Sequence, residues 1–264
     1  MTLIWTVYRN IYLLLITTTI ILSLPNKYNK SNIYSIKRYE LDPDLKSTLT
    51  NVHGVCFIIG WFFFILNGVF YIRYYKSFFE SKNILNQKIW FQVHRIFNTL
   101  ALLITTIGML CILIRHNFEW IGPKIGGKQN TSSGAVHAMM GVFSYGLLVL
   151  QVLISFLRCA PNHNNRKYFN WIHRFLGISS FLLATGTITI AAKFFGSHFT
   201  SPKNAEIMLY VFYGVILITI IVNEISLKFV LKKQMTITLI TLFFTSLIVC
   251  SYISALILTS KREQ

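Results

Sequence analysis

The feature that most constrains this chain is a series of long apolar stretches that together occupy most of its 264 residues. At a rise of about 1.5 Å per residue, roughly 20 apolar residues cross the ~30 Å hydrocarbon core of a bilayer. Only 12% of the residues are charged, which is too few to cover a soluble surface. We therefore predict an all-α, polytopic membrane helix bundle. Its six spans are 52–72, 91–114, 135–157, 171–192, 207–227 and 236–258.

A seventh apolar stretch, residues 11–24, is shorter and follows Arg9. Its length is typical of the h-region of a signal peptide, but the residues before Pro25 form a poor cleavage site. Residues 1–24 are therefore predicted to be a signal peptide or an uncleaved signal anchor. We divide the rest into an extracellular or lumenal segment at 25–48, a membrane domain at 49–230, and an additional helix with a tail at 231–264.

The net charge of +17 is distributed between the spans instead of forming one basic tract. This distribution indicates topology signals, with no nucleic-acid partner. The basic residues concentrate in the connections after the first, third and fifth spans, which we predict to be cytoplasmic. Asn29 and Asn130 begin Asn-x-Ser/Thr glycosylation motifs, and both lie in segments predicted to face outward. We expect a multi-pass glycoprotein in the lipid bilayer of the plasma membrane or of an endomembrane vesicle.

Four of the seven histidines lie at the N-terminal ends of four consecutive spans. Because successive spans run in opposite directions, His53 and His137 are predicted near the outer face, and His94 and His173 near the cytoplasmic face. Two imidazoles at one depth on different helices are the arrangement that ligates a haem iron on both sides. The sequence therefore predicts two haem sites, each held by two histidines. Zinc is disfavoured because neither level offers a third protein ligand.

The motifs around these histidines are Asn51-Val52-His53-Gly54, Trp90-Phe91-Gln92-Val93-His94, Val136-His137, Leu157-Arg158-Cys159-Ala160-Pro161-Asn162-His163 and Phe169-Asn170-Trp171-Ile172-His173-Arg174. With these motifs the chain resembles the cytochrome b561 family over roughly residues 52–230. The resemblance is greater to its animal ferric-chelate reductase branch, also called stromal-cell-derived receptor proteins. Many members of this branch carry reelin-like and DOMON domains ahead of the membrane core. We expect neither here, because about 27 residues separate the apolar stretch 11–24 from the span 52–72.

The resemblance implies a four-helix core with two haems b, one ligated by His53 with His137 and the other by His94 with His173. It also implies an ascorbate-dependent ferric-chelate reductase that passes electrons from cytosolic ascorbate to an outer ferric chelate or monodehydroascorbate. Arg73 lies in a further matching motif and Arg174 in the one quoted above, so both are candidates for binding haem propionates or ascorbate. The alternative is that these arginines are ordinary positive-inside residues. A non-enzymatic accessory or assembly protein on the same scaffold is the second interpretation, and a homodimer is left open.

Several polar residues within the spans receive structural predictions. Asn67 and Gln151 are expected to form hydrogen bonds between helices. Glu224 is expected to pair with Lys228 one turn further on. Glycines are expected to permit close helix packing, and at Gly54 and Gly141 the approach of a backbone or macrocycle. The glycines concerned are Gly54, Gly60, Gly68, Gly108, Gly141 and Gly177.

Overall fold

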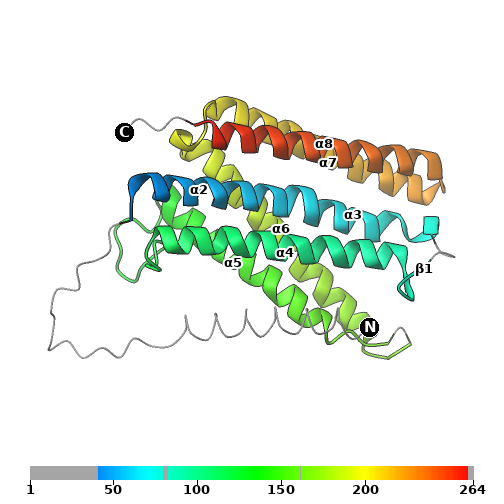
Figure 1. Cartoon of the computed structure of the whole chain (residues 1–264). Helices are drawn as coiled ribbons and strands as arrows, with labels where there is room; N and C mark the ends of the chain where they lie inside the picture. Colours follow the sequence, from blue (N-terminus) through cyan, green and yellow to red (C-terminus); the bar gives the residue numbers. More distant parts are fainter. Residues whose placement is uncertain (1–40, 80–82, 161, 261–264) are drawn as a thin grey trace. The chain divides into compact units, whose positions relative to one another are not determined.

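The computed structural model describes residues 41–79, 83–160 and 162–260 (Figure 1). The stretch 1–24 and Asn29 lie outside these residues, so the predictions for them are not addressed. Within the described residues, six helical segments are long and apolar enough to cross a membrane. These are Pro43–Tyr74, Ile89–Arg115, Ser133–Ser155, Arg166–Phe194, Pro202–Lys228 and Lys232–Leu258. The predicted number of spans and the all-helical bundle are confirmed.

The first span consists of three consecutive helical pieces, α2 (Pro43–Ile58), the π-helix η1 (Ile59–Ile65) and α3 (Leu66–Tyr74). It begins before residue 49, where the sequence placed the domain boundary. Asp42 caps the helix, because its Oδ1 accepts a hydrogen bond from the Asp44 backbone N–H at 2.7 Å. Pro43 suits the first helical position, where its missing N–H has no helical partner. Residues 43–48 are therefore helical.

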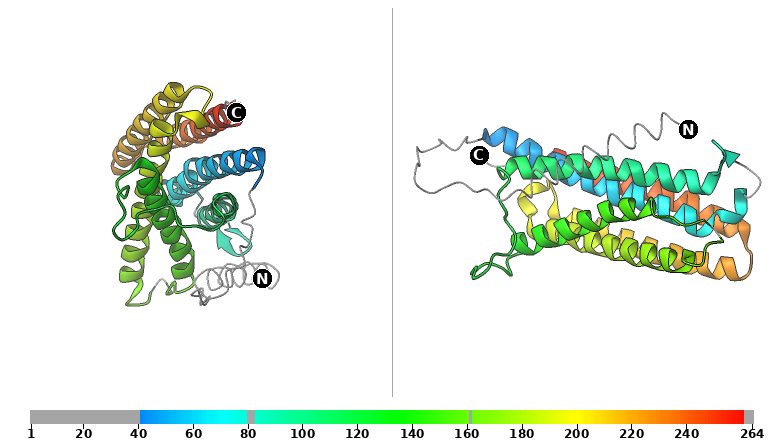
Figure 2. Two further views of the ribbon diagram at one scale, coloured as in Figure 1. Left: turned by 90° about the vertical axis from the view of Figure 1, so that its left-hand side faces the viewer. Right: turned by 90° about the horizontal axis from the view of Figure 1, so that it is seen from below.

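Four spans form two antiparallel hairpins. The first hairpin packs α2, η1 and α3 against α4 (Ile89–Arg115), and the second packs α5 (Ser133–Ser155) against α6 (Arg166–Phe194). A third hairpin, α7 (Pro202–Lys228) and α8 (Lys232–Leu258), contacts α6 through α7 and α2 through α8. Figure 2 shows this third hairpin running along one side of the first span. The four histidine-bearing spans are thus the two hairpins that precede α7.

A short connection links the first span to α4. It contains η2 (Lys76–Phe79) and the antiparallel strands β1 (Asn83–Ile84) and β2 (Gln87–Lys88). Leu85 and Asn86 between the strands have φ of 52° and 60°, as the tight turns that suit β-hairpins require. Gln92 Nε2 donates to the Ile84 carbonyl at 3.0 Å, which ties this hairpin to the first turn of α4. The connection is therefore anchored at the end of the bundle where His94 lies.

Helix α8 is attached to the rest of the bundle by polar contacts in an apolar environment. Asn67 Nδ2 donates to Ser246 Oγ at 2.9 Å, which confirms the hydrogen bond between helices predicted for Asn67. Thr238 Oγ1 donates to Asn223 Oδ1 at 2.9 Å. Such bonds between membrane helices contribute about 0.6–2 kcal/mol each. The last span is therefore an integral part of the bundle.

Candidate functional site

The structure places the four histidines in two pairs. The ring centroids of His53 and His137 are 6.3 Å apart, and those of His94 and His173 are 6.4 Å apart. Each pair joins one helix of the first hairpin to one helix of the second. This is the pairing that helix direction predicts, while the role of the four side chains as ligands is still a prediction.

The two pairs lie at different depths of the bundle. His94 contacts the carbonyl of Gly68, so Gly68 marks its level on the first span. Fifteen residues separate His53 from Gly68, which corresponds to roughly 22 Å at about 1.5 Å per residue. The pairs are therefore separated by most of the thickness of a hydrocarbon core.

Three of the four imidazoles bond to a backbone carbonyl of the antiparallel helix in their own hairpin. The contacts are His53 Nδ1 to Gly108 O at 3.0 Å, His94 Nδ1 to Gly68 O at 3.1 Å, and His137 Nδ1 to Thr187 O at 3.1 Å. Because a carbonyl only accepts, Nδ1 carries the proton and Nε2 keeps its lone pair. Asn98 Nδ2 is also 3.2 Å from His94 Nδ1, but it donates to the His94 carbonyl at 2.6 Å. These imidazoles are in the tautomer that binds a metal through Nε2.

The carbonyl acceptors follow a regular spacing along the chain. Gly108 lies fourteen residues after His94, and Thr187 fourteen residues after His173. Fourteen residues are close to four helical turns, so each histidine and its distant carbonyl share one helix face. In the first span the spacing is fifteen, from His53 to Gly68, and the π-helix η1 lies between them. A π-helix has more residues per turn than an α-helix, so it accommodates the extra residue. His53 and the Gly68 carbonyl therefore remain on the same face of the first span.

Glycine at two of the acceptor positions allows the helices to approach closely. A Cβ added at Gly108 would lie 2.8 Å from Cys56 Cβ and 2.9 Å from Phe57 Cδ2. A Cβ added at Gly68 would lie 3.0 Å from Phe97 Cβ. Any side chain there would separate α4 from the first span and carry the histidines away from their acceptors.

The donor set and the ring spacing both fit haem. Two imidazoles on opposite sides of one iron, each with a metal–nitrogen bond of about 2 Å, have ring centroids roughly 6 Å apart. Within the described ranges, no group of three or more His, Cys, Asp or Glu side chains is placed to hold a metal ion. Each level thus offers two neutral nitrogen donors, which suits a metal that brings its own equatorial ligands.

Cationic side chains surround the His94–His173 pair. Arg158 lies within electrostatic reach of both imidazoles, and Lys76 within reach of His94. Partial desolvation lowers the pKa of Lys76, and the nearby guanidinium groups, Arg174 first, lower it further. We call Lys76, Arg158, Arg166 and Arg174 the basic rim. A cluster of this kind raises the local concentration of anions.

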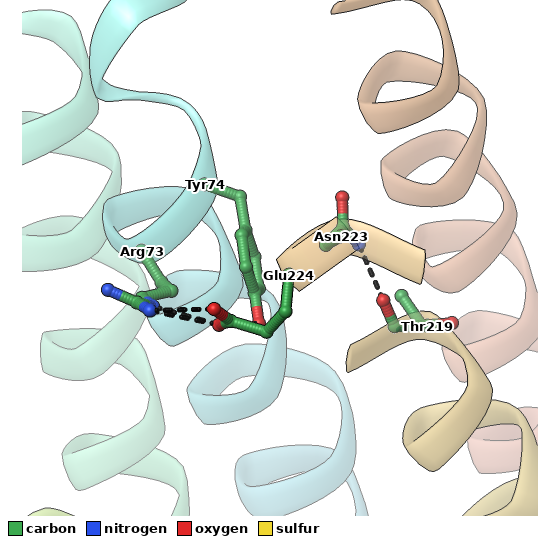
Figure 3. A network of polar contacts seen from close by, with 5 residues as sticks. All are labelled: Arg73, Tyr74, Thr219, Asn223 and Glu224. Carbon is green, nitrogen blue, oxygen red and sulfur yellow. Dashed lines mark hydrogen bonds and ion pairs between the residues drawn. The ribbon is translucent and has the colours of Figure 1, made fainter. Parts of the chain in front are cut away.

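Arg73 is held by a carboxylate on α7 (Figure 3). Its Nη2 donates to both oxygens of Glu224, at 2.9 and 3.0 Å, and the Tyr74 hydroxyl donates to Glu224 Oε1 at 2.9 Å. The predicted Glu224–Lys228 pair is therefore wrong. Glu224 pairs instead with the guanidinium group of Arg73 on α3, which binds both carboxylate oxygens. Arg73 links α3 to α7, whereas Arg174 is exposed on α6. Contacts of either arginine with propionates or ascorbate are still a prediction.

Apolar spans that carry histidines paired across two hairpins are typical of helical membrane cytochromes. The sequence model of the family described as eukaryotic cytochrome b561 matches residues 52–195, and the chain belongs to this family, whose members bind haem b. The resemblance seen in the histidine motifs is thereby confirmed. The matched residues contain all four paired histidines.

Curated relatives are similar at a low level of identity. Ferric-chelate reductase 1 of Homo sapiens is 26% identical over 177 residues, which are 64% of this chain and 27% of the relative. Its Mus musculus counterpart is 24% identical over 183 residues, 69% of this chain and 29% of the relative. A cytochrome b561 and DOMON domain-containing protein of Arabidopsis thaliana is 26% identical over 172 residues, 65% of this chain and 37% of the relative. The chain spans less than a third of the two reductases. No solved structure matches the chain significantly.

Proposed function

We propose that this chain transfers electrons across a membrane and binds two haems b, one between His53 and His137 and one between His94 and His173. The observation that carries this proposal is the pairing of the imidazoles at 6.3 and 6.4 Å on opposite hairpins. When bound, haem supplies a reversible one-electron ferric/ferrous couple in a six-coordinate site. The carbonyl-bonded Nδ1 atoms hold three rings in place for it.

Buried aromatic residues lie between the two levels. Trp61 and Phe62 of η1 are 1% and 0% exposed, and Trp61 lies eight residues after His53 and seven before Gly68. Phe181 of α6 packs against both aromatic rings, with centroids 6.3 Å apart in each case. We infer that this buried aromatic cluster keeps water and ions from passing between the two levels, while an electron can cross it.

In this proposal the electron donor binds at the basic rim beside His94 and His173. Ascorbate is an anion at neutral pH, so the rim attracts it electrostatically. The excess of Lys and Arg in the connections at this end supports a cytoplasmic orientation of the rim. Each ascorbate loses one electron and a proton to become monodehydroascorbate. The electron leaves at the His53–His137 level to a ferric chelate or to monodehydroascorbate outside.

Liposomes test this reaction directly. Purified protein is reconstituted into vesicles that enclose ferric citrate and a ferrous indicator, and ascorbate is added to the outside. We expect the trapped indicator to change colour only in vesicles with protein, and the rate to be lost in His53→Leu and in His94→Leu. His163→Leu is the matched control, because this exposed loop histidine belongs to neither pair. Haem-loaded protein that leaves the trapped ferric citrate unreduced contradicts the proposal.

A further inference from the structure

His173 differs from the other three paired histidines. Its Nδ1 is buried and has no hydrogen-bond partner among the described residues. A histidine that ligates a metal nearly always donates this second N–H to an acceptor, which fixes the ring and makes it a stronger ligand. A buried N–H without an acceptor is also unfavourable. If His173 is a ligand, as proposed above, the structure must supply an acceptor near it.

The spacing along the four helices identifies where this acceptor belongs. Each of the other three helices carries one histidine and, further along, the carbonyl that accepts a hydrogen bond from the histidine of its partner helix. This carbonyl lies fourteen residues after the helix's own histidine in α4 and α6, and fifteen residues after it in the first span, which contains the π-helix. On α5 the residue fourteen positions after His137 is Gln151. Gln151 is 8% exposed, and its Nε2 donates to the backbone carbonyl of His173, as predicted from the sequence. The register of the hairpin thus brings Gln151 to His173.

The amide oxygen of Gln151 has no partner either. Gln151 Oε1 and His173 Nδ1 are both buried atoms without a hydrogen bond within the described residues. One is an acceptor and the other a donor, and the two residues are already in contact. Gly177 makes room for the amide on α6, since a Cβ there would lie 3.1 Å from Gln151 Nε2.

We propose that Gln151 is the positioning residue of His173, with its amide oxygen accepting the hydrogen bond from His173 Nδ1. This inference rests on the proposed function. It completes the set of four supported imidazoles, and it uses a side chain where the other three use backbone carbonyls. A donated Nδ1–H makes the imidazole richer in electrons, which favours ferric iron and lowers the reduction potential. Residue 151 therefore sets the potential of the donor-side haem separately from that of the other haem.

Two substitutions separate the acceptor from the rest of the side chain. Gln151→Met keeps the length and removes the amide, while Gln151→Glu keeps an acceptor oxygen. Gln92→Met is the matched control. Gln92 is 2% exposed and lies two residues before His94, but its amide donates to the Ile84 carbonyl. Potentials of both haems are measured by redox titration of the visible spectrum, with low-temperature EPR of each ferric haem as a second readout.

We expect Gln151→Met to raise the midpoint potential of the His94–His173 haem alone and to change its EPR signal. Gln151→Glu is expected to leave that potential at or below the wild-type value, and Gln92→Met to change neither haem. Haem loss at this level in Gln151→Met with retention in Gln151→Glu also supports the assignment. An unchanged potential in Gln151→Met, an equal shift of both haems, or haem loss in both variants overturns it. Wild-type protein with fewer than two haems contradicts the proposed function instead.

Discussion

Replacing Gly108 by alanine tests how the first hairpin supports His53. The new Cβ would lie 2.8 Å from Cys56 Cβ and 2.9 Å from Phe57 Cδ2, whereas carbon atoms normally pack at about 3.5–4.0 Å. Neither neighbour can rotate far, because Cys56 Cβ is fixed to the backbone and Phe57 packs against the His53 ring at 4.7 Å. The helices must therefore separate by roughly 1 Å. That shift breaks the 3.0 Å bond from His53 Nδ1 to the Gly108 carbonyl.

The expected magnitude follows from three contributions. Overpacking costs about 1–3 kcal/mol. The lost hydrogen bond costs about 0.5–1.5 kcal/mol. Alanine returns about 0.5–1 kcal/mol through its better helix propensity. The three ranges combine to a net destabilisation of about 0.5–4 kcal/mol. Loss of a residue that hydrogen-bonds to a metal ligand typically weakens metal binding about 10- to 100-fold. We therefore expect haem affinity at the His53–His137 level to decrease by about 10- to 100-fold.

The assay is a haem titration of apo-protein, followed by absorbance, in a His94→Leu background that leaves only the His53–His137 level. Gly146→Ala is the control on α5, because a Cβ at Gly146 meets nothing within 4 Å. We expect Gly108→Ala to bind haem at least tenfold more weakly than Gly146→Ala. Equal affinities of the two variants would refute the close-approach reasoning.

Three further predictions concern the basic rim and helix α8. Lys76→Met should raise the KM for ascorbate about two- to fivefold at constant kcat, as expected for one partly solvated charge, and an unchanged KM excludes Lys76 from docking. The wild-type KM should rise with pH below the ordinary lysine value of about 10.4, because the lowered pKa makes Lys76 lose its positive charge at lower pH than usual. Steady-state kinetics of reduction by ascorbate from pH 6 to 10 measure this KM. In Lys76→Arg, which keeps its charge over this range, we expect no rise in KM. Ser246→Ala removes the hydrogen bond from Asn67 and should lower the free energy of unfolding by about 0.6–2 kcal/mol, measured by thermal unfolding, while the haem spectrum stays unchanged. Ser251→Ala is the control on the exposed face of α8 and should change neither the stability nor the spectrum.

The spans and the histidine pairing could be predicted because both depend on residue type. Apolar length defines each span, and alternating helix direction decides which histidines share a depth. The support of the imidazoles was missed, because its acceptors are backbone carbonyls that any residue provides. The spacing of fourteen residues between a histidine and a later glycine was the available signal at His94 and Gly108. Without the structure, the fifteen-residue spacing from His53 to Gly68 has no explanation, since only the π-helix keeps that pair in phase.

Two other predictions show where local rules are overridden by packing. Glu224 was assigned to Lys228 by the rule for neighbours one turn apart, but a residue of another helix, Arg73, donates three hydrogen bonds to it. Gly54 was expected to admit a backbone or macrocycle, yet its Cβ position faces the Ile257 side chain of α8 at 3.2 Å. Both outcomes depend on contacts between distant segments, which hydropathy and spacing do not reveal.

The central claim is that the chain binds one iron between each pair of histidines. The most direct measurement is the haem content of purified protein by pyridine haemochrome assay, combined with EPR of the ferric state. We predict two low-spin haems b per chain, and one in either His53→Leu or His94→Leu. A single haem in the wild type, a high-spin signal, or a haem content that neither substitution changes would contradict the account.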